Sequence, residues 1–232
     1  MMPPPPPPPP PGTVMMESPH HIPPDSPTLT VIMNVVMTGT HIVIGAVSLS
    51  AFLFSNIFVG TSSMTQHIQL CVFGYVILMS QAILTFSPHS WANSLMYPKK
   101  KIIHLVMQVV GSLMAIVGSI IRFASLTDHL QSAHGILGFI AFILTVVSLV
   151  GGVMNLIFPK HLSTLLFRLV HICVGILTIS VAFLSLCFGF NDLYRTLLGD
   201  INANLSISLT IMALCGVLSF TMLNLVKKFN RR

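Results

Sequence analysis

Charged residues are scarce in this chain of 232 residues: Asp, Glu, Lys and Arg together make up only 7% of it. An average soluble domain has about 25%. Hydrophobic residues reach 53%, so the chain lacks the polar shell of a water-soluble fold and is predicted to be an integral membrane protein. Its net charge of +6 is too small and too localised for a nucleic-acid-binding surface, so no nucleic-acid partner is expected.

Acidic residues and cysteines are few as well. Of the five acidic residues, Asp128, Asp192 and Asp200 are expected in loops, and none falls within a long apolar stretch. This absence argues against a proton relay built on carboxylates. The four cysteines form no Cys-x-x-Cys pair, which excludes the usual spacing of a zinc site.

Apolar sequence is abundant, and it falls into six stretches. Each is long enough to supply the ~20 residues that cross a bilayer as a helix. Backbone groups in lipid must be hydrogen-bonded internally, and no stretch alternates polar and apolar residues as a β-barrel strand does. The predicted fold class is therefore an all-α membrane protein with six transmembrane helices, at about Leu29–Val59, Met64–Phe86, Lys101–Ala124, Gln131–Phe158, Ser163–Phe190 and Ala203–Val226.

The two ends of the chain differ from the apolar middle. Residues Pro3 to Pro11 are nine consecutive prolines, which favour polyproline II and cannot form a core. We expect a disordered proline-rich tail over residues 1–28, a six-span domain over 29–226 and a basic tail over 227–232. Nine of the eleven lysines and arginines fall on one side of this topology, and only Arg122 and Arg195 on the other. The positive-inside rule then predicts that both termini are cytoplasmic.

Four histidines inside the apolar stretches are regularly spaced. His67, His104, His134 and His171 are separated by 37, 30 and 37 residues, so His67/His134 and His104/His171 share an interval of 67. An ionisable residue inside a membrane span is costly and points by default to a functional site. The repeat predicts that spans two–three and four–five are related hairpins. Together they would form a central four-helix bundle, a fold that builds cofactor sites from facing helices.

In this topology each histidine pair meets at one depth, near opposite membrane faces. His171 lies deeper in its expected span, which Arg168 can offset by snorkelling to the headgroups. No Asp, Glu or Cys accompanies either pair at ligand spacing, and two histidines alone make a poor zinc site. They do suit the axial positions of a haem, so two bis-histidine haems and electron transfer are predicted. The alternative is that these histidines only form hydrogen bonds between helices, the interpretation favoured for the unpaired His41.

With these residues identified, the sequence resembles the cytochrome b561 family, especially its short animal branch. The resemblance covers about residues 64–190. It implies haem b, with the second-span histidine paired to the fourth-span one and the third to the fifth. One departure is Gln66-His67-Ile68 in place of Trp-His-Pro, which we expect to alter packing rather than ligation. The matching segments are His67 followed by LMSQAILTFSP ending at Pro88, HLVMQ from His104, His134–Gly135, Gly151–Val153, Phe158–Lys160 and His171 ahead of Gly175.

The resemblance also implies an activity: an ascorbate-dependent transmembrane reductase, with cytoplasmic ascorbate as donor and a ferric chelate or monodehydroascorbate as acceptor. Relatives bind ascorbate through basic residues near the cytoplasmic haem. The register here is shifted, so Lys99, Lys100, Lys101 and Arg168 are candidates for this role rather than matched positions. Two alternatives stay open, a histidine-lined transporter and a structural subunit without redox activity. The sequence also leaves open the acceptor, the membrane (endoplasmic reticulum, vesicle or plasma membrane) and whether the chain forms a homodimer.

Overall fold

The computed structural model describes residues 2, 4, 26–60, 62–157 and 165–229. Nearly all of the proline run lies outside the described residues, and so do residues 230–232 and the predicted Phe158–Lys160 motif. Within the described part of the chain every regular element is helical. The elements are α1 (Pro27–Phe54), η1 (Ser55–Val59), α2 (Ser63–Cys71), η2 (Val72–Met79), α3 (Ser80–Leu84), α4 (Tyr97–Ala124), α5 (Ala133–Ile157), α7 (Leu165–Gly189), η3 (Phe190–Tyr194), α8 (Arg195–Leu198) and α9 (Asp200–Phe229).

Six helical segments among the described residues are long and apolar enough to cross a membrane, which confirms the predicted fold class. Adjacent α-helical and π-helical elements join into single spans where they follow one another without a break. The spans are Pro27–Val59, Ser63–Leu84, Tyr97–Ala124, Ala133–Ile157, Leu166–Leu198 and Asp200–Leu223.

Several boundaries differ from those expected. The third span begins at Tyr97 rather than at Lys101, and Pro98 lies in its first turn. The backbone N–H groups of a first turn have no acceptor within the helix, so a proline there costs no hydrogen bond. The three lysines therefore belong to the start of α4. The fifth span continues beyond Phe190 to Leu198, so the prediction that Asp192 lies in a loop was wrong. Asp192 is exposed within η3, close to the end of the span.

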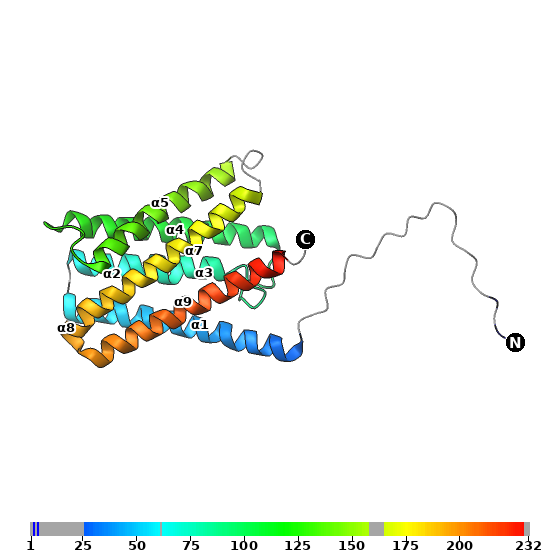
Figure 1. The fold of residues 1–232 in the computed structure, drawn as a ribbon, viewed down its shortest axis with the longest axis horizontal. Helices are drawn as coiled ribbons and strands as arrows, with labels where there is room; N and C mark the ends of the chain where they lie inside the picture. The colour runs from blue at the N-terminus through cyan, green and yellow to red at the C-terminus, as the bar shows by residue number, and fades with distance from the viewer. Residues whose placement is uncertain (1, 3, 5–25, 61, 158–164, 230–232) are drawn as a thin grey trace.

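The helices pack in a closed ring in which α1 contacts α9, α9 contacts α7, α7 contacts α5, α5 contacts α4, and α4 contacts α2 and η2. Contacts between α1 and η2 complete the ring. Figure 1 shows the long helices lying side by side, with α1 and α9 next to each other on one side of the molecule. Spans two to five thus form a four-helix bundle, and the first and last spans cover one side of it.

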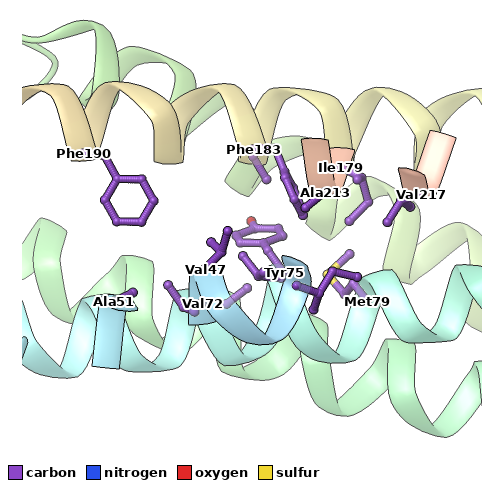
Figure 2. Close-up of a cluster of buried hydrophobic side chains, with 14 of the residues drawn as sticks. Val47, Ala51, Val72, Tyr75, Met79, Ile179, Phe183, Phe190, Ala213 and Val217 are labelled. Atoms are coloured by element: carbon purple, nitrogen blue, oxygen red, sulfur yellow. The ribbon is translucent and has the colours of Figure 1, made fainter. Parts of the chain in front are cut away.

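Small residues allow the second and third spans to approach closely. A Cβ atom added at Gly74 would lie 2.6 Å from the carbonyl oxygen of Gly111 and 3.1 Å from the Cβ of Ala115. Contacts this short require glycine on at least one helix, as is usual where membrane helices meet. The main apolar core lies between this hairpin and the α1, α7 and α9 helices, and includes Val47 and Phe183 (Figure 2).

Candidate functional site

His67 on α2 and His134 on α5 face each other across the four-helix bundle. Their ring centroids lie 5.9 Å apart, and the two ring planes are nearly perpendicular, at 82°. Both rings line a cavity of about 780 Å³. This volume lies within the range of ~300–1,000 Å³ that is usual for ligand and cofactor pockets.

Each of these rings is held by a backbone carbonyl of the next helix in the chain. The Nδ1 atom of His67 lies 3.1 Å from the oxygen of Gly118, and the Nδ1 atom of His134 lies 2.8 Å from the oxygen of Ser185. A carbonyl can only accept, so Nδ1 carries the hydrogen and Nε2 keeps its lone pair. A neutral imidazole fixed in this tautomer is ready to bind a metal through Nε2.

The separation of the two rings fits a shared metal between them. With metal–nitrogen bonds of about 2 Å, two imidazoles on opposite sides of one ion place their ring centroids about 6 Å apart. No group of three or more His, Cys, Asp or Glu side chains within the described ranges could hold a metal ion by itself. The remaining ligands would therefore come from a macrocycle, and the adjoining cavity offers space for one.

His104 on α4 is held in the same manner from the opposite end of the bundle. Its Nδ1 atom lies 2.9 Å from the carbonyl oxygen of Ala82, and the ring of Phe86 packs 5.0 Å from the imidazole. His171 on α7 lies close enough to His104 for charges on the two rings to interact. The Cε1 atom of His171 lies 3.5 Å from the place where a Cβ of Gly152 would be, so its ring packs against α5.

The four histidines define two levels in the bundle, which we call the His67 level (His67 and His134) and the His104 level (His104 and His171). On α4, the carbonyl that binds His67 belongs to Gly118, 14 residues beyond His104. On α7, the carbonyl that binds His134 belongs to Ser185, also 14 residues beyond His171. At 1.5 Å per residue, the two levels are about 21 Å apart on both helices.

Polar residues lie at the mouth of the cavity on the His67 level. Arg122, Asp128 and His129 line this mouth, together with the exposed Asp192. The imidazole of His129 stacks on Phe123 with a centroid distance of 4.5 Å and an interplanar angle of 4°. The cavity therefore joins the apolar histidine pair to a polar surface that carries both signs of charge.

The basic residues predicted near the His104 level lie on the surface of the bundle. Lys99, Lys101 and Arg168 are exposed, and Lys100 is half-buried. The Lys101 ammonium lies 4.9 Å from the ring centroid of Tyr97. All three lysines lie at the start of α4, about one turn before His104 on the same helix.

The remaining histidines of the described ranges have other partners. The Nδ1 atom of His41 accepts from the Gln81 amide at 2.8 Å, so this histidine joins two helices, as expected. The Nδ1 atom of His89, in the turn between Leu84 and Tyr97, lies 2.9 Å from the side-chain oxygen of Asn34 on α1. His20, His21 and His161 lie outside the described residues.

Sequence reasoning identified the histidines but not the groups that hold them. The acceptors are backbone carbonyls, which every residue has, so the residue type does not indicate which carbonyl accepts. The 67-residue interval could have located one of them from the other, because Gly118 and Ser185 are themselves 67 positions apart. The hydrogen bond between Tyr75 and Thr145 at the centre of the bundle was also missed.

The sequence matches the profile of eukaryotic cytochrome b561 over residues 66–196, a segment that covers more than half of the chain and contains all four histidines. A search of curated proteins gives no significant match. The matched family binds haem b and transfers electrons across membranes, and it acts with ascorbate and an electron acceptor. This chain, an integral multi-pass membrane protein by its six spans, belongs to the eukaryotic cytochrome b561 family.

Proposed function

We propose that the chain is an ascorbate-dependent transmembrane reductase with two haems b. Cytoplasmic ascorbate gives electrons at the His104 level, and an acceptor takes them at the His67 level, on the other side of the membrane. The acceptor is a ferric chelate or monodehydroascorbate. In this proposal residues 29–226 form the redox domain and both terminal tails are cytoplasmic.

The observation that carries the proposal is the pair His67 and His134, which face each other at 5.9 Å beside a large cavity. His67 and His134 would be the axial ligands of one haem iron, and His104 and His171 those of the other. A haem with both axial positions filled by imidazole exchanges single electrons and offers no open position to oxygen. The hydrogen bonds from Nδ1 orient His67, His134 and His104 and increase the basicity of these ligands.

The exposed basic residues support a donor site at the His104 level. Lys99, Lys100 and Lys101 start α4, and Arg168 lies one turn before His171 on α7. Their positive charge favours the ascorbate monoanion over neutral compounds and raises its local concentration. The same residues support the cytoplasmic orientation, since lysine and arginine collect on that side of membrane proteins.

The cavity mouth supports an acceptor site at the His67 level. Arg122 supplies a positive charge for an anionic acceptor, and His129 provides a flat aromatic surface fixed by Phe123. In one turnover the ascorbate monoanion loses one electron and releases one proton to the cytoplasm. The acceptor gains that electron. Moving one charge across the full membrane field changes the free energy by ~2.3 kcal/mol per 100 mV, so the membrane potential affects the direction of transfer.

Absorbance spectroscopy of the purified full-length chain tests the cofactor. We expect two b-type haems per chain, both reduced by ascorbate. The variant His41→Leu is the matched control, because it removes an intramembrane histidine outside both pairs and should keep both haems. A folded, colourless protein would refute the proposal in favour of a transporter or structural subunit.

Proteoliposomes loaded with ascorbate test the direction of transfer. With the lysine-bearing face inside, external ferric citrate should be reduced only when ascorbate is trapped in the lumen. Vesicles that contain the protein but no ascorbate give the background. Two bound haems without ferric or monodehydroascorbate reduction would show a haem protein that lacks the proposed reductase activity.

A further inference from the structure

Tyr75 is a buried polar residue at the centre of the four-helix bundle. It lies on η2, a π-helical segment in the middle of the second span, and its side chain is 8% exposed. Its hydroxyl lies 2.8 Å from the hydroxyl of Thr145 on α5. The Thr145 hydroxyl donates to the carbonyl of Ala141 at 2.7 Å, so Tyr75 is the donor in its bond to Thr145.

This pair lies between the two histidine levels on both helices. Tyr75 is eight residues after His67 and seven before Ala82, whose carbonyl binds His104. These intervals correspond to about 12 Å and 10 Å along the helix. Thr145 lies eleven residues after His134 and seven before Gly152, against which His171 packs. The hydrogen bond therefore crosses the bundle in the gap between the levels.

Few aromatic side chains occupy this gap. On the described helices of the bundle, Tyr75 and Phe183 are the buried aromatic residues between the levels. Phe142 is half-buried there, and Phe73 and Phe139 are exposed. Tyr75 also lines the His67 cavity. Figure 2 shows the Tyr75 ring in the middle of the core, among its buried apolar side chains. Short π-helical segments are frequent at functional sites, consistent with a special role for η2.

We propose that Tyr75, held by Thr145, is the positioning residue that fills the gap between the haems and sets the rate of electron transfer from one to the other. This inference rests on the two-haem function proposed above. If His104 and His171 hold one haem and His67 and His134 the other, a single electron would pass from the His104 level to the His67 level. Tyr75 is neither oxidised nor deprotonated in this step.

The physical reason is the medium through which the electron passes. Electron tunnelling weakens more steeply across empty space than across packed atoms. An aromatic ring in van der Waals contact on both sides provides a continuous medium, whereas a void of the same size has no atoms in contact with its walls. The bond to Thr145 keeps the ring in one orientation across the gap.

Stopped-flow mixing of the oxidised holoprotein with ascorbate tests the role. The first absorbance phase reports the haem at the donor side, and the second reports transfer to the other haem. Replacing the ring in Tyr75→Leu or Tyr75→Met removes packed atoms from the gap, and we expect the second phase to slow roughly tenfold. The first phase and both midpoint potentials, measured by equilibrium titration, should not change. Tyr75→Phe and Thr145→Val keep the ring and should slow the second phase much less.

Phe220 provides the matched control. It is also a buried aromatic residue, at 2% exposure, and it packs 6.4 Å from the ring of His89. It lies on α9, outside the four-helix bundle, and it does not line the His67 cavity. Phe220→Leu should leave the second phase unchanged.

Three results would contradict the proposals, and each contradicts a different part of them. A wild-type second phase in a ring-less variant with both haems overturns the role of Tyr75. Loss of one haem from both ring-less variants would also overturn it, because Tyr75 would then be only a wall of the cofactor pocket. Wild-type protein with a single haem would instead refute the two-haem function itself.

Discussion

At the His67 level, both histidines donate to a carbonyl of the following helix, 51 residues further along the chain in each case. At the His104 level, His104 donates to Ala82, 22 residues before it, and Phe86 covers its ring. The first level opens through a large cavity onto polar loops. The second lies beneath exposed lysines at the start of α4.

The difference teaches how a repeated hairpin can make two unlike ends. Within each hairpin, the first histidine binds to the second helix, and this construction is copied at an interval of 67 residues. The connections at the two ends are not copied. The turn between Leu84 and Tyr97 places Phe86 against His104, and the lysines follow at the start of α4. At the other end, Arg122 lies near the end of α4 and His129 in the connection to α5.

The largest expected effects come from removing one ligand at each level. His67→Ala and His134→Ala should each lose one haem and keep a haem that ascorbate still reduces. His104→Ala and His171→Ala should also lose one haem, but the haem that remains should be cut off from ascorbate. The reason is that only the His104 level borders the proposed donor site. Haem content per chain and the extent of reduction by ascorbate measure both effects.

Dithionite provides the control for these variants, since it should reduce every haem that is bound. Equal loss of ascorbate reduction at both levels would contradict the assignment of the donor site. Loss of both haems from every variant would mean that the two levels fold as one unit.

The next effect separates the charged groups of the two ends. Replacing Lys99, Lys100 and Lys101 together by glutamine should lower the rate of haem reduction by ascorbate roughly tenfold at low ionic strength, because the attraction of an anionic donor is lost. Salt screens such attraction over about 10 Å, so the difference from wild type should shrink as salt is added. Stopped-flow rates over a salt series measure this.

Arg122→Gln is the counterpart at the other end. It should leave reduction by ascorbate unchanged and slow reoxidation by ferric citrate. A triple lysine variant with an unchanged rate at every salt concentration would leave these lysines with a topological role only.

The six spans and the histidine pattern could be predicted because they depend on quantities visible in sequence. The length of an apolar stretch must match the bilayer, and an imidazole inside such a stretch stands out against its neighbours. The ends of spans were less predictable. Lys101 looks like a boundary by charge, yet Pro98 starts the helix earlier. Asp192 looks like a loop residue, yet the helix continues through η3.

The contacts that orient the site depend on tertiary packing, which residue types do not encode. Gly118 and Ala82 act through backbone oxygens that every residue has. Tyr75 reads as an ordinary aromatic of an apolar helix until the structure places it against Thr145. A repeat in sequence can indicate which segments are equivalent, but it does not show which atoms of those segments meet.

A smaller effect is expected from crowding one ligand at each level. A Cβ at Gly189 would lie 3.1 Å from Nδ1 of His134, a ring that Ser185 already fixes, so Gly189→Ala should strain the His67 level. Overpacking of this kind costs about 1–3 kcal/mol. A Cβ at Gly152 would lie 3.5 Å from His171, an ordinary contact, and Gly152→Ala should be tolerated. The midpoint potential of each haem and the melting temperature of the holoprotein measure the contrast.

Equal responses of the two glycine variants would contradict the tighter packing at the His67 level. If Gly152→Ala shifted the midpoint potential of the haem at the His104 level and Gly189→Ala shifted neither potential, the His104 level would be the more tightly packed one.

The smallest effect concerns the hydroxyl of Ser185, whereas Ala82, the residue that holds His104, has no hydroxyl. This hydroxyl donates to the carbonyl of His134 at 3.0 Å and lies 3.2 Å from its Nδ1 atom. Ser185→Ala removes the hydroxyl but keeps the backbone carbonyl that holds the imidazole. We expect both haems to stay bound and the holoprotein to lose about 0.5–1 kcal/mol of stability, the usual contribution of one hydrogen bond between membrane helices.

Ser48→Ala is the matched control, because the Ser48 hydroxyl is buried but bonds within its own helix, to Ile44 at 2.8 Å. It should destabilise less than Ser185→Ala in the same thermal melt. Loss of a haem in Ser185→Ala would mean that the hydroxyl, rather than the carbonyl, holds His134 in its ligating orientation. In that case the two levels would differ in the groups that fix their ligands, and not only in what surrounds them.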